Sequence, residues 1–156
     1  MAAPAMDDIA DRFADRGVTS VFIYTREAHP GELVRHHTSM DVKRANARAF
    51  LEHSSVRRPI LLDDLAGTVH HAYGILPNTA WIIGSNGRIL YKANWTAAAD
   101  VAAALADILD AQARRGRDRL VPMQTERVGW RHNDPRGFRA GLERAGPQAV
   151  RDFYGE

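Results

Sequence analysis

The sequence predicts an α/β fold, because segments with helical periodicity alternate with short apolar segments typical of strands. Three observations carry this prediction. An apolar, β-branched and aromatic run occupies residues 18–24 and ends in polar residues beside a Pro-Gly turn. Two later apolar segments are joined by Asn86-Gly87, the strongest short signal for a β-hairpin. Residues 97–115 then place apolar side chains at the spacing of an amphipathic helix.

The first part of the chain is expected to alternate helix and strand. Residues 4–16 carry apolar side chains at i, i+3, i+4 and i+7, which predicts a helix with one buried face. Residues 18–24 form a nearly continuous apolar run, the pattern of a strand covered on both faces. Thr38 or Ser39 is placed to cap the next helix, which is expected to end near residue 53.

The second part continues with shorter elements. In order, these are a strand at 60–62, a short helix at 65–73, hairpin strands at 79–83 and 88–92, and a long helix at 97–115. After residue 116 the chain is polar and irregular, with two short helical segments at 135–144 and 147–154 that could pack back on the domain. We therefore divide the chain into a domain of residues 1–116 and a C-terminal extension of residues 117–156.

Composition limits the classes of function. The chain has 156 residues, 45% of them hydrophobic and 26% charged, and these values suit one globular domain. Its formal net charge of +2 comes with no concentrated basic patch, so nucleic acid is not expected as a partner. No apolar run approaches the roughly 20 residues of a membrane span, and the N-terminal residues lack the pattern of a signal peptide. A cytoplasmic protein that does not bind membranes is expected.

Ionisable residues follow the apolar run at 18–24. Glu27 and His29 could form a proton-transfer pair, because imidazole titrates near neutral pH and a nearby carboxylate can orient it. The same residues also fit a solvated loop in which His29 precedes a turn at Pro30. Tyr24 could donate a hydrogen bond to a substrate, or it could be a core residue with its hydroxyl at the rim.

Two pairs of adjacent histidines raise the question of a metal site, since imidazole is a common zinc ligand. His36-His37 and His70-His71 have no carboxylate at ligand spacing, and adjacent side chains on a strand point to opposite faces. No metal and no cofactor are therefore expected. The absence of cysteine also excludes a disulfide, a thiolate zinc site and a thiol nucleophile within this chain.

The segment VFIYTREAHPGE resembles the part of iodothyronine deiodinases and their bacterial redoxin-like relatives in which a strand ends in Tyr-x-x-Glu-x-His. The segment RPILLDDLAGTVHHAYGILPNTAWIIGSNGRILYKANW resembles a later part of the same family. There an Asp-Asp pair, a Tyr-Gly, a Leu-Pro and a hairpin follow in that order. The resemblance covers roughly residues 6–109 and implies a thioredoxin-like fold.

The resemblance also implies roles for individual residues. Tyr24, Glu27 and His29 match the family's site motif, and His37 matches its second histidine. The implied activity is thiol- or selenol-dependent redox chemistry, either reductive dehalogenation or peroxide reduction. Glu27 and His29 would handle the proton, with Tyr24 and His37 assisting. The implied partner of the full-length product is a thiol reductant or a thioredoxin-like protein.

The resemblance also implies two substrate-binding residues. Pro77 matches the proline, often cis, that faces the nucleophile in thioredoxin folds. Asn78 stands where deiodinases carry a glutamate, which argues against iodothyronine as the substrate.

The family's nucleophile is a selenocysteine or cysteine in a loop after the central strand, and this chain contains no cysteine. The resemblance implies a domain that lacks its first strands and the nucleophile loop, and hence an inactive chain. The reading frame could start downstream of a selenocysteine codon, a partner or swapped homodimer could fill the gap, or the two halves of the sheet could pair directly. The alternative function is a non-catalytic interaction module that dimerises or binds a partner through exposed sheet edges.

Overall fold

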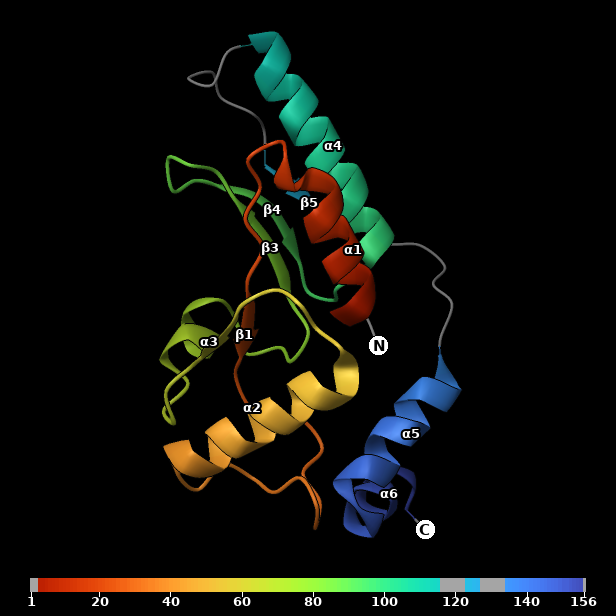
Figure 1. Cartoon of the computed structure of the whole chain (residues 1–156). Helices are drawn as coiled ribbons and strands as arrows, with labels where there is room; N and C mark the ends of the chain where they lie inside the picture. The colour runs from red at the N-terminus through yellow and green to blue at the C-terminus, as the bar shows by residue number, and fades with distance from the viewer. Residues whose placement is uncertain (1–2, 116–122, 127–133, 156) are drawn as a thin grey trace.

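The structure, a computed structural model, describes residues 3–115, 123–126 and 134–155. Helices and short strands alternate along these residues, so the expected α/β class is confirmed (Figure 1). None of the helices in the described part of the chain combines the length and the apolar character that crossing a membrane requires.

The described strands form two separate sheets. In the first, β1 (Phe22–Tyr24) pairs in parallel with β2 (Ile60–Leu62). In the second, β3 (Ala80–Ile83) and β4 (Ile89–Ala93) form an antiparallel hairpin, and β5 (Gln124–Thr125) pairs in parallel with β4. The hairpin predicted around Asn-Gly is confirmed, whereas β5 lies in a region that was expected to be irregular. Direct pairing of the two halves is not found between the described strands.

A hydrophobic core joins the second sheet to two helices. Helices α1 (Ala3–Ala14) and α4 (Ala98–Arg115) lie side by side against this sheet (Figure 1). The buried core residues are Ile9 and Phe13 of α1, Leu90, Tyr91 and Ala93 of β4, and Val101, Ala104, Leu105 and Ile108 of α4. Helical periodicity therefore predicted the packing faces of both helices correctly.

A buried carboxylate fastens α1 to the segment before β2. Asp7 is 2% exposed and accepts a hydrogen bond from the backbone N–H of Arg57 at 2.7 Å. Its other oxygen lies 3.6 Å from Nε of Arg58, whose side chain is 6% exposed. This buried ion pair holds the first helix against the first sheet.

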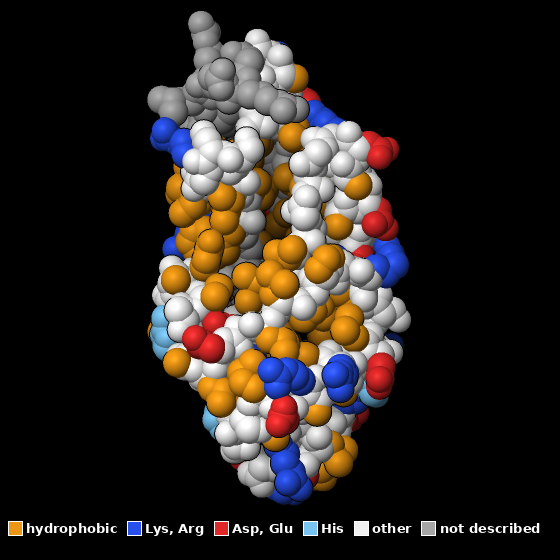
Figure 2. Space-filling model, turned by 60° about the vertical axis from the view of Figure 1, so that its left-hand side comes forward, with side chains coloured by type: hydrophobic (Ala, Val, Ile, Leu, Met, Phe, Trp, Pro, Cys, Tyr) orange, Lys and Arg blue, Asp and Glu red, His pale blue; other side chains and the backbone are white. Residues whose placement is uncertain are grey.

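The prediction of a long strand covered on both faces at residues 18–24 was wrong. Strand β1 contains only Phe22–Tyr24, while Val21 is 46% exposed and Ile23 is 37% exposed. The physical reason is that the main hydrophobic core packs on α1, β4 and α4, and includes neither Val21 nor Ile23. Figure 2 shows hydrophobic side chains gathered around a hollow on one face of the molecule.

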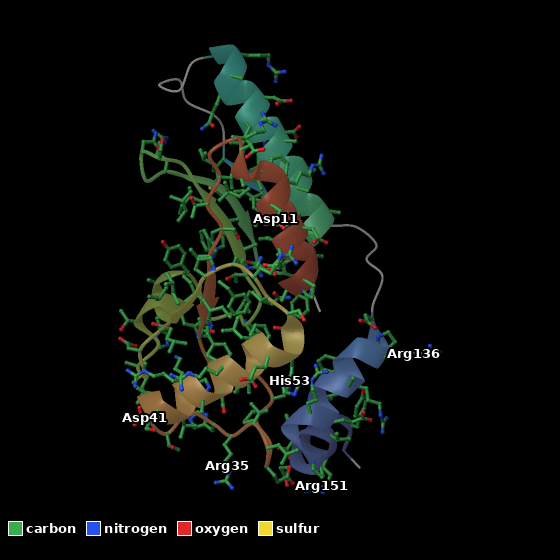
Figure 3. The ribbon with its side chains drawn as sticks, viewed as in Figure 1. Asp11, Arg35, Asp41, His53, Arg136 and Arg151 are labelled. Atoms are coloured by element: carbon green, nitrogen blue, oxygen red, sulfur yellow. The ribbon has the colours of Figure 1, made fainter. Side chains whose placement is uncertain are left out.

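Helix α2 (Met40–Ser54) follows the loop after β1, and its start agrees with the sequence. The side chain of Ser39 caps it by accepting a hydrogen bond from the N–H of Val42 at 3.2 Å. Figure 3 labels Asp41 and His53 near its two ends. Lys43 and Ala47 are buried on its inner face.

The remaining helices are short. Helix α3 (Thr68–Ala72) is shorter than predicted, and its first N–H groups donate to the carboxylates of Asp63 and Asp64. Helices α5 (Pro135–Ala145) and α6 (Pro147–Tyr154) match the two predicted C-terminal segments and pack against each other.

Candidate functional site

Three of the residues expected at the site lie together at the carboxyl end of β1. Tyr24 is the last residue of the strand, and its ring centroid is 5.4 Å from that of His37. Nε2 of His37 is 3.8 Å from Oε1 of Glu27, close enough for an ion pair but too long for a hydrogen bond. The loop between β1 and α2 thus brings Tyr24, Glu27 and His37 into one cluster.

Burial controls the protonation of Glu27. Its side chain is 21% exposed, and removal from water raises the pKa of the carboxyl from 4.5 to about 7. Desolvation disfavours the charged form of an acid, so near neutral pH a substantial fraction of Glu27 is protonated. A carboxyl group with this pKa can both donate and accept a proton at physiological pH.

His37 is shifted in the direction that keeps it neutral. Its side chain is 5% exposed, and burial lowers the pKa of the imidazole, with the charges of Lys43 and His36 acting in the same direction. Nε2 of His37 and the hydroxyl of Tyr24 are both buried without a hydrogen-bond partner among the described residues. Buried polar atoms are usually paired, so these two atoms are exceptions at the site.

Sequence reasoning missed Lys43, which lies behind this cluster. The side chain is 1% exposed, and its ammonium donates hydrogen bonds to the carbonyl oxygens of Thr25 and, at 3.1 Å, Asp64. Burial lowers the pKa of Lys43, while the charges of Asp63 and Asp64 raise it. The available signal was weak: Lys43 precedes Ala47 by one helical turn on the inner face of α2, but a lysine is normally assigned to the surface.

His29 is not part of the cluster in this structure. It is exposed, and its ring makes edge-on contacts with Phe138 of α5 at 5.6 Å and with Phe153 of α6 at 5.4 Å between centroids. No ion pair or hydrogen bond joins it to Glu27 within the described residues. The histidine that the fold places beside Glu27 is therefore His37.

The C-terminal helices are fastened to the same loop. Glu32 accepts hydrogen bonds from the backbone N–H of Gln148 at 2.9 and 3.0 Å and pairs with Arg151 at 3.2 Å, so its carboxylate caps α6. Figure 3 shows Arg151 at this end of the molecule. The chain approaches so closely that a Cβ on Gly31 would lie 2.3 Å from the carbonyl oxygen of Ala145. The site loop is thus held between α2 and the C-terminal helices.

Pro77 and Asn78 lie in the turn before β3. Pro77 is exposed, and the peptide bond before it is trans, as are the other described peptide bonds. The carbonyl oxygen of Asn78 accepts hydrogen bonds from the N–H and the hydroxyl of Thr96 at 2.8 and 3.1 Å. No hydrogen bond or ring contact in the described part of the chain joins these two residues to the cluster.

The remaining polar candidates have structural roles. Asp63 accepts hydrogen bonds from the N–H groups of Val69 and His70, and Asp64 accepts from Thr68, so both carboxylates cap α3 as the sequence indicated. Across residues 3–115, 123–126 and 134–155, no three His, Asp or Glu side chains are arranged to hold a metal ion.

Comparison of the chain with protein-family models, with curated proteins and with solved structures finds no match. The chain is therefore described by its fold class and its site. It is an α/β protein with a buried Tyr–Glu–His cluster at the carboxyl end of a parallel strand.

Proposed function

We propose that this chain provides the acid–base part of a redox site of the thioredoxin-fold, deiodinase-like kind. The thiol or selenol would come from another chain segment or from a partner, because the 156 residues contain no cysteine. The observation that supports this best is the Glu27 carboxyl, buried with a pKa of about 7 and 3.8 Å from His37. General acids work best when their pKa lies near the working pH.

The cluster would supply the proton in either of two reactions. In peroxide reduction, a thiolate or selenolate attacks one peroxide oxygen and the O–O bond breaks. The chalcogen is oxidised to a sulfenic or selenenic acid, and the departing alkoxide takes the proton of Glu27. In reductive dehalogenation, the chalcogen takes the halogen, the carbon keeps the electron pair, and Glu27 protonates that carbon. A thiol reductant then restores the nucleophile, and solvent reprotonates Glu27.

Position in the fold is consistent with this assignment. Ligand sites of α/β proteins gather at the carboxyl ends of parallel strands, where Tyr24 and Glu27 lie. The buried hydroxyl of Tyr24 and Nε2 of His37 would hydrogen-bond the reacting group. In this proposal Glu27 acts with His37, and His29 takes no part in proton transfer.

The test adds a protein or peptide that supplies a cysteine or selenocysteine nucleophile to the purified chain. Turnover of peroxide or aryl halide with a thiol reductant is expected only when that nucleophile is present. Glu27→Gln should then lower kcat by about 10²–10⁴-fold. The matched control is Glu52→Gln, which removes an exposed carboxylate from α2 and should leave kcat unchanged.

Two results would contradict the proposal. Turnover by the purified 156-residue chain with a thiol reductant would show that no external nucleophile is needed. A complete system in which Glu27→Gln and Glu52→Gln are equally active would show that the buried carboxyl does not handle the proton.

A second function, a non-catalytic interaction module, is favoured by the two separate sheets. Val21 just before β1, Ile23 in β1 and Ile83 in β3 are exposed apolar side chains, and the hollow in Figure 2 is surrounded by others of this kind. Unpaired strand edges bind extended segments of other chains. A mass measurement in solution tests this function. We expect a dimer, and we expect the substitution Ile23→Lys to dissociate it. A stable monomer that captures no partner would contradict this second function.

A further inference from the structure

The buried ammonium of Lys43 connects the ends of two strands. Lys43 lies in the first half of α2, and its ammonium donates hydrogen bonds to the carbonyl oxygens of Thr25 and Asp64. Thr25 directly follows β1, and Asp64 lies two residues after β2. The buried side chain of Lys43 therefore holds the chain just beyond the ends of both parallel strands. On the side of β1, the residue it holds is Thr25, which lies between Tyr24 and Glu27.

We propose that Lys43 is a positioning residue of the site, whose ammonium ties the ends of β1 and β2 together and thereby holds the chain between Tyr24 and Glu27. This inference rests on the proposed function and adds a residue that positions its proton donor.

The charges around His37 support this assignment. Burial lowers the pKa of His37 most, the charge of Lys43 on α2 lowers it further, and His36 adds a smaller effect in the same direction, while Glu27 lies 3.8 Å from Nε2 of His37. The carboxylates whose charges act on Lys43, Asp63 and Asp64, follow β2. Like charges oppose each other strongly where water is excluded, so a buried ammonium penalises an imidazolium nearby.

The two acidic neighbours do not pair with the ammonium by hydrogen bonds. The carboxylate of Asp63 accepts the N–H groups of Asp64, Val69 and His70. That of Asp64 accepts the N–H and hydroxyl of Thr68. The described hydrogen bonds of the Lys43 ammonium go to carbonyl oxygens, which stabilise its positive charge without neutralising it.

The experiment measures the titration of the His37 ring and of the Glu27 carboxyl by NMR, in wild type, Lys43→Met and Lys43→Arg. Removal of the charge in Lys43→Met is expected to raise the pKa of His37 by about half a pH unit to one unit. Lys43→Arg keeps the charge and can still donate to both carbonyl oxygens, so His37 should titrate as in wild type. His36→Gln, at an exposed neighbour, should have a smaller effect than Lys43→Met.

The outcomes separate the two proposals. A folded Lys43→Met protein with an unchanged His37 titration overturns the role of Lys43, and so does a Lys43→Arg protein that shifts as far as Lys43→Met. If Lys43→Met does not fold, Lys43→Arg decides alone: a wild-type titration supports the inference and a shifted one overturns it. A wild-type Glu27 that titrates at its ordinary value would contradict the proposed function, while the response of His37 to Lys43 would still be measured.

Discussion

Replacing Glu27 by glutamine should remove a pH dependence from the stability of the fold. The folded carboxyl has a pKa of about 7 because it is buried, whereas in the unfolded chain the same group has its usual value of 4.5. Below pH 4.5 the group is protonated in both states, and its neutral form is compatible with burial. As the pH rises, the unfolded chain ionises first, so the free energy of unfolding falls until the folded carboxyl also ionises near pH 7.

The magnitude follows from the difference between the two pKa values. Each pH unit corresponds to about 1.4 kcal/mol, so a rise from 4.5 to about 7 costs the folded state about 3 kcal/mol once Glu27 is ionised. The glutamine side chain introduced by Glu27→Gln has nearly the same shape and no charge to bury. The stability of wild type relative to Glu27→Gln should therefore fall by about 3 kcal/mol between about pH 4 and pH 8.

The assay is urea denaturation of both proteins at closely spaced pH values. Glu32→Gln is an informative control, because hydrogen bonds from the backbone at Gln148 and the charge of Arg151 lower the pKa of Glu32. The stabilisation due to Glu32 is present above the usual pKa and is lost as the pH falls, which is the opposite sign. Parallel stability curves for wild type and Glu27→Gln from about pH 4 to about pH 8 would refute the reasoning.

Three further substitutions test other contacts. Ser39→Ala removes the cap of α2 and should lower the free energy of unfolding by about 1 kcal/mol in urea denaturation; no loss would mean that Ser39 is not the cap. Asp7→Ala leaves the buried guanidinium of Arg58 without its carboxylate and should cost about 3 kcal/mol in the same assay, whereas a cost under about 1 kcal/mol would argue against a buried ion pair. Glu32→Ala removes the acceptor for the N–H of Gln148, so amide exchange should become faster in α6 and stay unchanged in α4; equal protection of α6 in both proteins would contradict the docking contact.

Local signals were sufficient wherever an element depends on its own residues. The spacing of Val101, Leu105 and Ile108 predicts α4 and its buried face, and both are present. Asn86-Gly87 predicts the β3–β4 turn, where Gly87 has a φ of 79° that a residue with a side chain rarely adopts. Thr38 and Ser39 predict the start of α2 to within one residue, and Ser39 is the cap.

The organisation of the sheets was harder to predict from the sequence, because β1 and β5 pair with strands far away along the chain. The apolar run at 18–24 indicates a strand but not which of its faces other elements cover, so Val21 and Ile23 were expected to be covered. Strand β5 has only two residues and exists through its pairing with Tyr91 and Lys92. Such short segments carry no periodicity of their own.

The sequence predicted which residues form the site better than it predicted which histidine lies beside Glu27. The resemblance identified Tyr24 and Glu27 through its motif and His37 as a second histidine, and these three do cluster, but it made His29 the partner of Glu27. The fold decides otherwise, because the loop returns to the end of β1 through His37. Hydropathy cannot identify Lys43 as buried, since its ammonium is satisfied by two carbonyl oxygens from residues that follow two separate strands.

The contact between Glu32 and α6 has a consequence for the order of folding. Its two partners, Glu32 and Gln148, are 116 positions apart in the sequence. Contacts of such long range close a large loop and form after local helices and hairpins. During synthesis, the residues around Glu27 therefore leave the ribosome long before the helix that braces their loop exists. Maturation of the site is thereby coupled to the synthesis of α6, and Glu32→Ala should leave the early folding phases unchanged while slowing the last one.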